Sequence, residues 1–377
     1  MFRFKLPGCL LYDEIILRKV KNMNSLIPII IPAYEPDMRL IRLLEELSIR
    51  KNLIIIVNDG SGQEYEPIFE RAKAILREDG IILTHKTNRG KGRALKTAFS
   101  YILERFPNAI GAVTADSDGQ HNMKAIESVE KALMSNQMSL VLGIRDFNDI
   151  GIPWKSKFGN KLTMKVLSYV AGIRINDTQT GLRGIPRSFM EHLLDVPGDR
   201  FEFETSMLIE SVGYYSIIEV PIETIYDSKE NHKTHFRPVT DSLKIYCILG
   251  KRFLKYVFSS LSSSILDIVL FTLFCYVFKK ENNNLYVVFS TIMARIFSAI
   301  YNYFINYKIV FRSQQKVRKT ALKYCLLAIM QMGLSAILVT LGVHVINVVP
   351  EVFIKIPIDF LIFFASYYIQ QNYIFLI

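Results

Sequence analysis

Short apolar runs alternate with amphipathic stretches from about residue 26 to residue 226. Apolar runs of roughly four to eight residues between polar turns are typical of buried strands, and apolar residues three or four positions apart are typical of helices. Their alternation predicts an α/β fold with a mostly parallel, Rossmann-like sheet and helices on both faces. We expect strands at 27–32, 53–60, 81–86, 109–116 and 140–145, and helices at 38–49, 64–78, 92–106 and 123–135.

The pattern changes after about residue 249, where four long apolar stretches follow one another. Each is long enough to cross a bilayer as a helix of about 20 residues. The expected spans are 256–278, 285–307, 324–349 and 352–375. The preceding segment, 241–255, has apolar residues at helical spacing with basic neighbours, which is typical of a helix on a membrane surface, although an ordinary connecting helix would look similar.

These patterns divide the chain of 377 residues into four parts. They are an N-terminal extension (1–25), an α/β domain (26–240), an interfacial helix or linker (241–255) and an all-α, four-span transmembrane domain (256–377). The second and fourth spans end similarly, in YFINYKIVF and YYIQQNYIF, so that Tyr303 matches Tyr367 and Phe311 matches Phe375. This similarity is compatible with two duplicated hairpins or with chance aromatic likeness.

Charge orients the membrane half. The net charge is +11, and the loop between the second and third expected spans is rich in Arg and Lys but lacks acidic residues. The positive-inside rule therefore predicts a multi-pass protein of the cytoplasmic membrane with both termini and the α/β domain in the cytosol. The four cysteines form no CxxC pair, which fits a reducing compartment and argues against a zinc site. Within the spans, Asp267 could pair with Arg295, either structurally or around a lipid phosphate, and Asp359 is also intramembrane.

The stretch TADSDGQH ends the expected strand at 109–116 with two carboxylates. In an extended segment Asp116 and Asp118 point to the same side, and Gln120 adds a neutral oxygen. Hard oxygen ligands suit Mg²⁺ or Mn²⁺. An EF-hand loop is excluded because His121 occupies the position where that loop needs glycine.

Several polar motifs follow the expected strands in a fixed order: PAYEP, VNDGSG, NRGKG and DSDGQ, then GIRDF, WKSKFGNKLT, DTQTGLRG, RFEFET and THFRPVTDSLKIY. In this order they resemble family 2 glycosyltransferases of the GT-A type, and within them the polyprenyl-phosphate glycosyltransferases related to dolichyl-phosphate mannose synthase. The membrane half resembles the GtrA-like domain. The two resemblances cover nearly the whole chain after about residue 25.

The resemblance implies site residues by motif. Those that would take part in catalysis are Asp116, Asp118 and Arg145. The metal would lie on Asp118, Gln120 and Asp116. Those that would bind the sugar nucleotide are Pro32, Ala33, Tyr34, Glu35, Val57, Asp59 (at the base), Gly90, Lys91, Asp116, Ser117, Asp118, Arg145, Glu204 (or Glu202), Lys233 and His235. Those that would bind the lipid phosphate are Arg145, Ser156, Lys157, Asn160 and Arg183.

The implied activity is an inverting transfer of a hexose from a sugar nucleotide, UDP-glucose or GDP-mannose, to polyprenyl phosphate, aided by Mg²⁺ or Mn²⁺. The implied partners are donor, acceptor, the lipid bilayer and a second copy in a homo-oligomer, with no nucleic acid. Pro36 and Asn58 depart from the pattern of the mannose synthases, which leaves the base and the sugar open. The alternatives are an inactive scaffold or flippase for lipid-linked sugars, and a processive polysaccharide synthase, whose QxxRW pattern the single tryptophan, Trp154, does not match.

Overall fold

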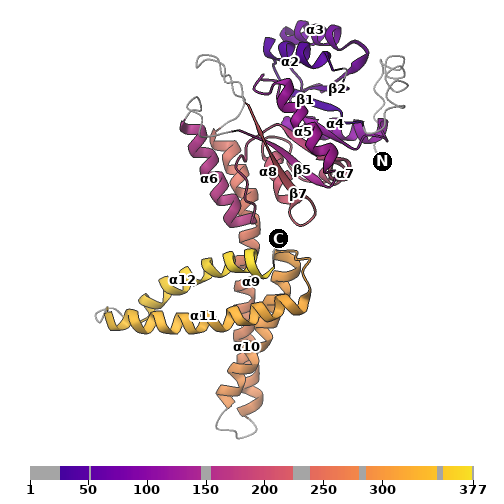
Figure 1. The fold of residues 1–377 in the computed structure, drawn as a ribbon. Helices are drawn as coiled ribbons and strands as arrows, with labels where there is room; N and C mark the ends of the chain where they lie inside the picture. Colours follow the sequence, from indigo (N-terminus) through magenta and orange to yellow (C-terminus); the bar gives the residue numbers. More distant parts are fainter. Residues whose placement is uncertain are drawn as a thin grey trace. The chain divides into compact units, whose positions relative to one another are not determined.

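The computed structural model of the protein describes residues 26–50, 52–145, 154–223, 238–279, 286–345 and 351–375. The chain forms two compact units. Unit 1 comprises Met1–Lys165 with Ile173–Ile248, and unit 2 comprises Val166–Gly172 with Leu249–Ile377. We describe each unit by itself (Figure 1).

Unit 1 is built on a seven-stranded sheet with the order β3-β2-β1-β4-β6-β5-β7. The pairs β1–β2, β1–β4, β2–β3 and β5–β7 are parallel, and β6 is antiparallel to both β4 and β5. The predicted mostly parallel sheet is therefore confirmed. The strands are β1 (Ile29–Ala33), β2 (Ile54–Asn58), β3 (Gly80–Thr84), β4 (Gly111–Thr114), β5 (Ser139–Arg145), β6 (Arg183–Pro186) and β7 (Ser216–Ile222).

Helices pack on both faces of this sheet. The helices between residues 38 and 211 are α2 (Met38–Ser48), α3 (Glu66–Leu76), α4 (Lys91–Arg105), α5 (Met123–Ser135), α6 (Trp154–Ala171), α7 (Arg187–Leu193) and α8 (Glu202–Ser211), of which the last part of α6 belongs to unit 2. Ile29 and Ile31 share one hydrophobic cluster with residues of α2, α3 and α5, whereas α4 packs against β1 and β2 from the other side. Because side chains alternate along a strand, both faces of β1 must be apolar, and the run of isoleucines meets that need.

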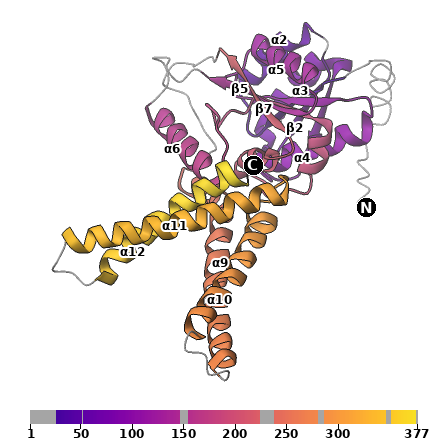
Figure 2. The same cartoon turned by 60° about the horizontal axis from the view of Figure 1, so that its bottom comes forward.

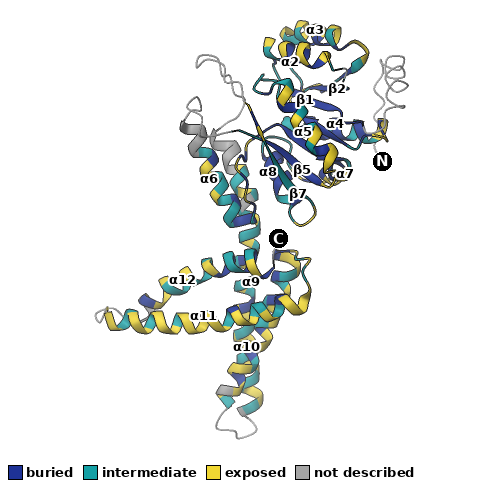
Figure 3. Cartoon of the chain, viewed as in Figure 1, coloured by how far each residue is buried: buried dark blue, intermediate teal, exposed yellow. Residues whose placement is uncertain are grey.

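The expected elements up to residue 145 agree with the structure to within a few residues. The strand β6 had no counterpart in the expectations, because RGIP contains glycine and proline and is only four residues long. Proline and glycine normally argue against a strand, and here the antiparallel pairing with β4 and β5 overrides that preference. Figure 3 shows the central strands of unit 1 as mostly buried, whereas β7 is largely half-buried.

Unit 2 is helical. Its helices are α9 (Pro238–Lys279), α10 (Tyr286–Ile305), α11 (Val317–Val345) and α12 (Glu351–Ile369), of which α9 begins before the unit boundary, and π-helical turns η3 (Asn306–Val310) and η4 (Gln370–Ile374) follow α10 and α12. The expected interfacial segment and the expected first span both belong to the single helix α9. Figure 2 shows α9 beside α10 and α11 beside α12 as two helical hairpins.

Three helical segments are long and apolar enough to cross a membrane, judged over the residues that the structure describes: Lys244–Phe278, Val317–Val345 and Phe353–Ile374. The helix α10 is 20 residues long and coincides with the second expected span, but it is not one of these three. Many large apolar side chains along these helices are exposed, as they would be toward lipid (Figure 3). The chain is therefore a membrane protein, and the four-span topology stays a prediction.

The contacts between the two hairpins are reciprocal, as duplicated hairpins require. Tyr303 contacts Phe375 at 5.9 Å between ring centroids, and the matching residues Tyr367 and Phe311 are 5.8 Å apart. Asn306 and its counterpart Gln370 lie at the centre, where Asn306 Nδ2 donates to Gln370 Oε1 at 3.0 Å. The repeated π-helical turns at both sites add a second shared feature. The sequence similarity between the span ends thus reflects a structural repeat.

The charged residues within the expected spans have partners. Arg295 Nη2 lies 3.6 Å from Asp267 Oδ2, and Ser298 donates to Asp267 Oδ1 at 2.8 Å. Asp359 accepts a hydrogen bond from Ser335 at 2.6 Å and is paired with Lys355 at 2.9 Å. The expected contact between Asp267 and Arg295 is therefore present, and both acidic groups are compensated within their own hairpins.

Candidate functional site

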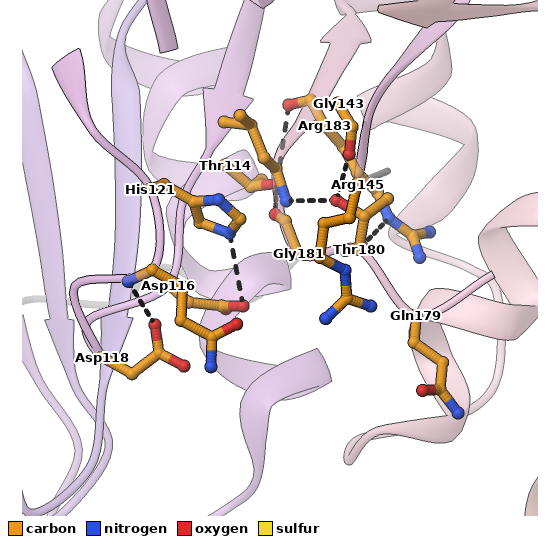
Figure 4. Close-up of polar contacts among 12 residues, drawn as sticks. Thr114, Asp116, Asp118, His121, Gly143, Arg145, Gln179, Thr180, Gly181 and Arg183 are labelled. Carbon is orange, nitrogen blue, oxygen red and sulfur yellow. Dashed lines mark hydrogen bonds and ion pairs between the residues drawn. The ribbon is translucent and has the colours of Figure 1, made fainter. Parts of the chain in front are cut away.

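The polar motifs of unit 1 gather at one edge of the sheet. PAYEP, NDGSG and DSDGQH follow β1, β2 and β4, which are neighbouring parallel strands, and Arg145 ends β5. Ligands of such sheets bind outside the carboxyl ends of the strands. Figure 4 shows Asp116 and Asp118 on one side of this edge, with Arg145 and Gln179 on the other.

The turn NRGKG is held by the carboxylate of Asp59. Its Oδ1 accepts the backbone N–H of Arg89 at 3.0 Å, and its Oδ2 accepts the N–H of Gly90 at 2.7 Å. His85 Nδ1 lies 2.7 Å from the same carboxylate, which is only 3% exposed. Asp59 therefore joins the end of β2 to the start of α4, whereas its expected contact with the base stays a prediction.

Lys91, the first residue of α4, bridges two carboxylates that are distant in sequence. Its Nζ lies 2.7 Å from Asp116 Oδ1 and 2.9 Å from Glu204 Oε1. All three side chains are partly buried, with exposures of 17%, 27% and 12% for Lys91, Asp116 and Glu204. The structure thus brings together three of the predicted residues from α4, the β4 loop and α8.

Glu202 has a different position. Its Oε1 accepts the backbone N–H groups of Asp199 and Arg200 at 3.2 and 3.3 Å. It therefore organises the loop before α8, while Glu204, two residues later, faces Lys91. Of the two alternatives that the sequence left open, Glu204 is the one near Asp116.

The two aspartates of the DSDGQH motif have opposite electrostatic environments. Burial alone would raise the pKa of Asp116, but the positive charge of Lys91 and the neighbouring His121 outweigh it and lower that pKa. For Asp118, burial and then the negative charge of Asp116 raise the pKa. The charges of Asp116 and Glu204 in turn raise the pKa of Lys91 against the opposing effect of burial.

The residues fit a divalent cation in their donor chemistry. Asp118 Oδ1 accepts the N–H of Gln120 at 3.1 Å, and no residue in the described ranges donates to its Oδ2. Asp118 is half-buried, and a cation beside its open oxygen would stabilise the charged form of this carboxylate. The described residues contain no group of three or more His, Cys, Asp or Glu that could hold a metal. Asp118, Asp116 and Gln120 would therefore hold Mg²⁺ or Mn²⁺ only together with oxygens of a ligand, as Mg²⁺ commonly binds.

Arg145 is fixed by a buried aspartate. Its Nε and Nη2 donate to the two carboxylate oxygens of Asp177 at 2.7 and 3.0 Å, and Asp177 is 0% exposed. This bidentate pair aims the guanidinium at the sheet edge. Asp177 opens the DTQTGLRG motif, whose Thr180 also donates to Gly143 O at 2.6 Å.

Besides Arg145, the residues expected at the lipid phosphate whose side chains are described are Asn160 and Arg183, and these two are buried. Asn160 accepts hydrogen bonds from Thr178 N and Oγ1 at 3.0 and 2.8 Å. Arg183 is 1% exposed and donates to the carbonyls of Thr180 and Glu204 at 2.9 and 2.7 Å. Both therefore brace the protein interior in this structure, and their phosphate contacts stay predictions. Ser156 and Lys157 lie on α6, but their side chains fall outside the described residues, as do Lys233 and His235 entirely.

The expected nucleotide pocket lies at the ends of β1 and β2. Pro32, Ala33 and Val57 are buried, and Tyr34 and Glu35 are half-buried. Glu35 adopts a left-handed conformation (φ 50°) and donates its N–H to Ser61 Oγ at 2.9 Å, which ties PAYEP to NDGSG. The side chain of Asn58 accepts the N–H of Ser61 at 2.9 Å. Ser117, between the two aspartates, is half-buried.

Sequence reasoning assigned no role to Asp177, Asp199, His85 or Lys96. Lys96 is 6% exposed and donates to the carbonyls of Val196 and Gly198 at 2.6 and 2.8 Å. Asp199 pairs with Arg93 at 2.8 Å. Only Asp177 had a signal, because it belongs to a quoted motif. Lys96 and Asp199 act through contacts about 100 residues apart in sequence, and His85 contacts Asp59 from 26 residues away, so the local pattern holds no sign of these contacts.

Two family models match separate parts of the chain. Residues 29–194 match the model described as glycosyl transferase family 2. Residues 255–375 match the model described as GtrA/DPMS, transmembrane domain. The first match extends from β1 to α7 and leaves out α8 and β7. The second match begins within α9 and includes α10, α11 and α12.

Similar proteins match a little over half of the chain. An uncharacterised protein of Methanocaldococcus jannaschii is 28% identical over 225 residues, covering 56% of this chain and 88% of its own length. A UDP-N-acetylglucosamine–dolichyl-phosphate N-acetylglucosaminyltransferase of Methanococcus voltae is 28% identical over 220 residues, covering 54% and 87%. Among solved structures, the glucosyl-3-phosphoglycerate synthase of M. tuberculosis is 16% identical with a TM-score of 0.38, covering 60% of this chain and 80% of that one.

Proposed function

Because the chain is a family 2 glycosyltransferase joined to a GtrA/DPMS transmembrane domain, we propose that it transfers a hexose from a sugar nucleotide to a polyprenyl phosphate in the membrane. The product would be a lipid-linked sugar for glycans or glycoconjugates of the cell envelope. The catalytic domain and both termini would lie on the cytosolic side, where sugar nucleotides are made.

The observation that carries this proposal is the electrostatic asymmetry at the end of β4. Asp116 is neutralised by Lys91 at 2.7 Å, while Asp118 has an oxygen without a partner in the described ranges. An open carboxylate beside a paired one is suited to a metal-bound diphosphate, because the metal completes its coordination with phosphate oxygens. The bound metal would withdraw charge from the leaving diphosphate.

The acceptor needs little activation. A phosphate monoester has a second pKa of about 6 and is largely dianionic at neutral pH, so it is already a nucleophile. The protein must instead position two groups of like charge close together. Lys91 and Arg145 would be two of the cations that compensate these charges, and Asp177 holds Arg145 in orientation. Attack on the anomeric carbon opposite the leaving group would invert its configuration.

The donor is proposed at the level of its class. UDP-glucose and GDP-mannose are the donors suggested by the motifs, and the name of the Methanococcus voltae relative adds UDP-N-acetylglucosamine. All three carry the diphosphate that the sheet edge would bind. The sugar and base would be selected by residues around PAYEP and Glu204.

The test uses the full-length protein, purified in detergent or nanodiscs. It is incubated with each radiolabelled sugar nucleotide, polyprenyl phosphate and Mn²⁺ or Mg²⁺, and the lipids are extracted and counted. We expect label in the lipid phase with one donor, dependent on both the acceptor and the metal. Absence of lipid-linked label with every donor, in protein that still binds nucleotide, would refute the proposed acceptor.

A further inference from the structure

The ammonium group of Lys91 lies beside the carboxylates of the DSDGQH motif, where a metal ion would otherwise compensate their charge. Its ammonium group contacts Asp116 Oδ1 at 2.7 Å and Glu204 Oε1 at 2.9 Å, and His121 Nε2 lies 3.7 Å from Asp116 Oδ2. Both oxygens of Asp116 are thus faced by a basic side chain (Figure 4 shows His121 beside Asp116). Among the residues that the structure describes, Asp118 is contacted only by the backbone N–H of Gln120, at 3.1 Å.

The backbone of Lys91 is held in place from two sides. Asp59 accepts the N–H groups of the two preceding residues, Arg89 and Gly90. The loop before α8 is fastened to α4 by Arg93 and Lys96, both of which pair with Asp199. A side chain added at Gly90 would collide with this loop, so the fit is close. The backbone of Lys91 is therefore fixed, and only its side chain can move from Asp116 and Glu204 to another negatively charged group.

We infer that Lys91 is an internal counter-cation that keeps the donor-free site from binding a divalent metal tightly, and that its ammonium group moves to the donor diphosphate when metal and donor enter together. This inference rests on the proposed function, because it assumes a metal-bound sugar nucleotide. The physical reason is repulsion: an ammonium group on Asp116 both occupies a ligand oxygen and repels a cation placed between Asp116 and Asp118. Donor phosphates supply new negative charge that compensates both cations.

The experiment measures metal binding rather than turnover. Mn²⁺ alone is titrated into the full-length, metal-free protein by isothermal titration calorimetry, and then again in the presence of UDP or of GDP. The variants are Lys91→Gln, which can still hydrogen-bond to the carboxylates, and Lys91→Arg, which keeps the charge. Lys73→Gln, at an exposed position in α3, controls for the change in net charge.

We expect Lys91→Gln to bind Mn²⁺ alone roughly tenfold more tightly than the unmodified protein, and to bind UDP or GDP with Mn²⁺ more weakly. Lys91→Arg and Lys73→Gln should bind Mn²⁺ alone as the unmodified protein does. If Lys91→Gln binds Mn²⁺ no more tightly, the inference is wrong. If the unmodified protein binds no Mn²⁺ even with UDP or GDP, the proposed metal-bound donor is wrong instead, and the inference falls with it.

A second pair of variants guards against loss of folding, since Lys91→Gln leaves two partly buried carboxylates without a cation. Glu204→Gln keeps Lys91 on Asp116, whereas the double variant Lys91→Gln/Glu204→Gln removes one charge of each sign. The double variant should bind Mn²⁺ alone roughly tenfold more tightly than Glu204→Gln. It should also gain a larger increase in melting temperature on addition of Mn²⁺. Equal affinities and equal shifts would contradict the inference.

Discussion

At the scale of single residues, the two aspartates of the DSDGQH motif differ although they are one residue apart. Asp116 has Lys91 as a counter-ion at 2.7 Å. The pKa of Asp118 is raised, first by burial and second by the negative charge of Asp116. A carboxylate in that state gains most from a metal ion. The two aspartates therefore differ in their proposed roles. The negative charge of Asp116 is already compensated in part by Lys91, whereas Asp118 is the proposed ligand whose charge the metal ion would compensate.

The first prediction concerns Asp118. Asp118→Asn keeps the shape of the side chain but removes its charge, so we expect kcat for lipid glycosylation to fall roughly a hundredfold to a thousandfold. The exposed Asp195→Asn serves as the control and should leave the rate unchanged. The measurement is the initial rate of label transfer to extracted lipid at saturating Mn²⁺. A rate within a factor of two of the unmodified protein would contradict the metal assignment.

The second prediction concerns the buried pair of Arg145 and Asp177. Asp177→Asn leaves the guanidinium beside an uncharged amide at a position with 0% exposure, and breaking a buried ion pair costs about 3–5 kcal/mol. We expect a lower melting temperature and a slower transfer reaction. Asp79→Asn, which changes a partly exposed residue in a short helix before β3, is the comparison for stability. An unchanged melting temperature in Asp177→Asn would show that the pair does not hold Arg145.

At the scale of elements, the site depends on how α4 and α8 begin. Gly90 ends the turn before α4 with φ 100°, and an added Cβ would meet the backbone oxygen of Asp199. Lys91 follows immediately and Glu204 lies in the first turn of α8. The first turns of α4 and α8, together with the loop 196–200, thus position Lys91 for its contacts. The same scale governs unit 2, where two hairpins repeat a pattern of tyrosine, amide and phenylalanine positions.

The third prediction tests the turn before α4. Gly90→Ala combines an unfavourable φ with a backbone collision, so we expect the melting temperature to fall by about 5 °C. Gly159→Ala is the matched control, because Gly159 lies inside α6 and an added Cβ meets nothing within 4 Å. It should raise the melting temperature by about 2 °C, since alanine favours helices. Thermal unfolding of the full-length protein in detergent gives both values, and equal shifts for the two variants would refute the argument.

The fourth prediction tests the contact between the hairpins. Asn306 donates to Gln370 at 3.0 Å, and both side chains are buried. A double-mutant cycle with Asn306→Leu and Gln370→Leu should give a coupling energy of about 0.6 kcal/mol, typical of hydrogen bonds within membranes. The exposed Thr291 on α10, changed to valine with the same Gln370→Leu, should give none. Unfolding in mixed micelles is the measurement, and zero coupling for the first pair would remove Asn306 and Gln370 as the central contact.

At the scale of the whole molecule, one chain contains a part that matches the model of glycosyl transferase family 2 and a part that matches the GtrA/DPMS transmembrane model. With the proposed acceptor, a polyprenyl phosphate, the tail would stay in the bilayer and the phosphate would react at the membrane surface. A transmembrane domain in the same chain would keep the proposed catalytic domain beside that acceptor. The net charge of +11 fits this proposal, since basic loops would orient the spans and basic side chains would compensate phosphates.

The fifth prediction concerns topology. A fluorescent protein fused after Ile377 should fluoresce, and alkaline phosphatase fused there should be inactive, because the four-span arrangement places the C-terminus in the cytosol. Phosphatase fused in the loop after Val345 should be active. Activity of the phosphatase at Ile377 would require either an odd number of spans or both termini outside, and would overturn the expected topology.

The sequence by itself determined the order of elements up to β5, the division into two halves and the presence of Asp116 and Asp118 at a strand end. These features follow from local periodicity, which the neighbouring residues alone encode. It also pointed to the repeat in the membrane half through Tyr303 and Tyr367. It missed β6, because four residues with glycine and proline form a strand only when β4 and β5 are already beside them.

Only the tertiary structure decided which charges meet. Lys91, Asp116 and Glu204 are far apart along the chain, and their contacts depend on how α4, β4 and α8 are set around the same sheet edge. The same holds for Asp59, which binds the turn before α4, and for Asp177, which holds Arg145. Ion pairs form between whichever charged groups the packing brings within about 4 Å, and no local pattern in the sequence specifies that distance.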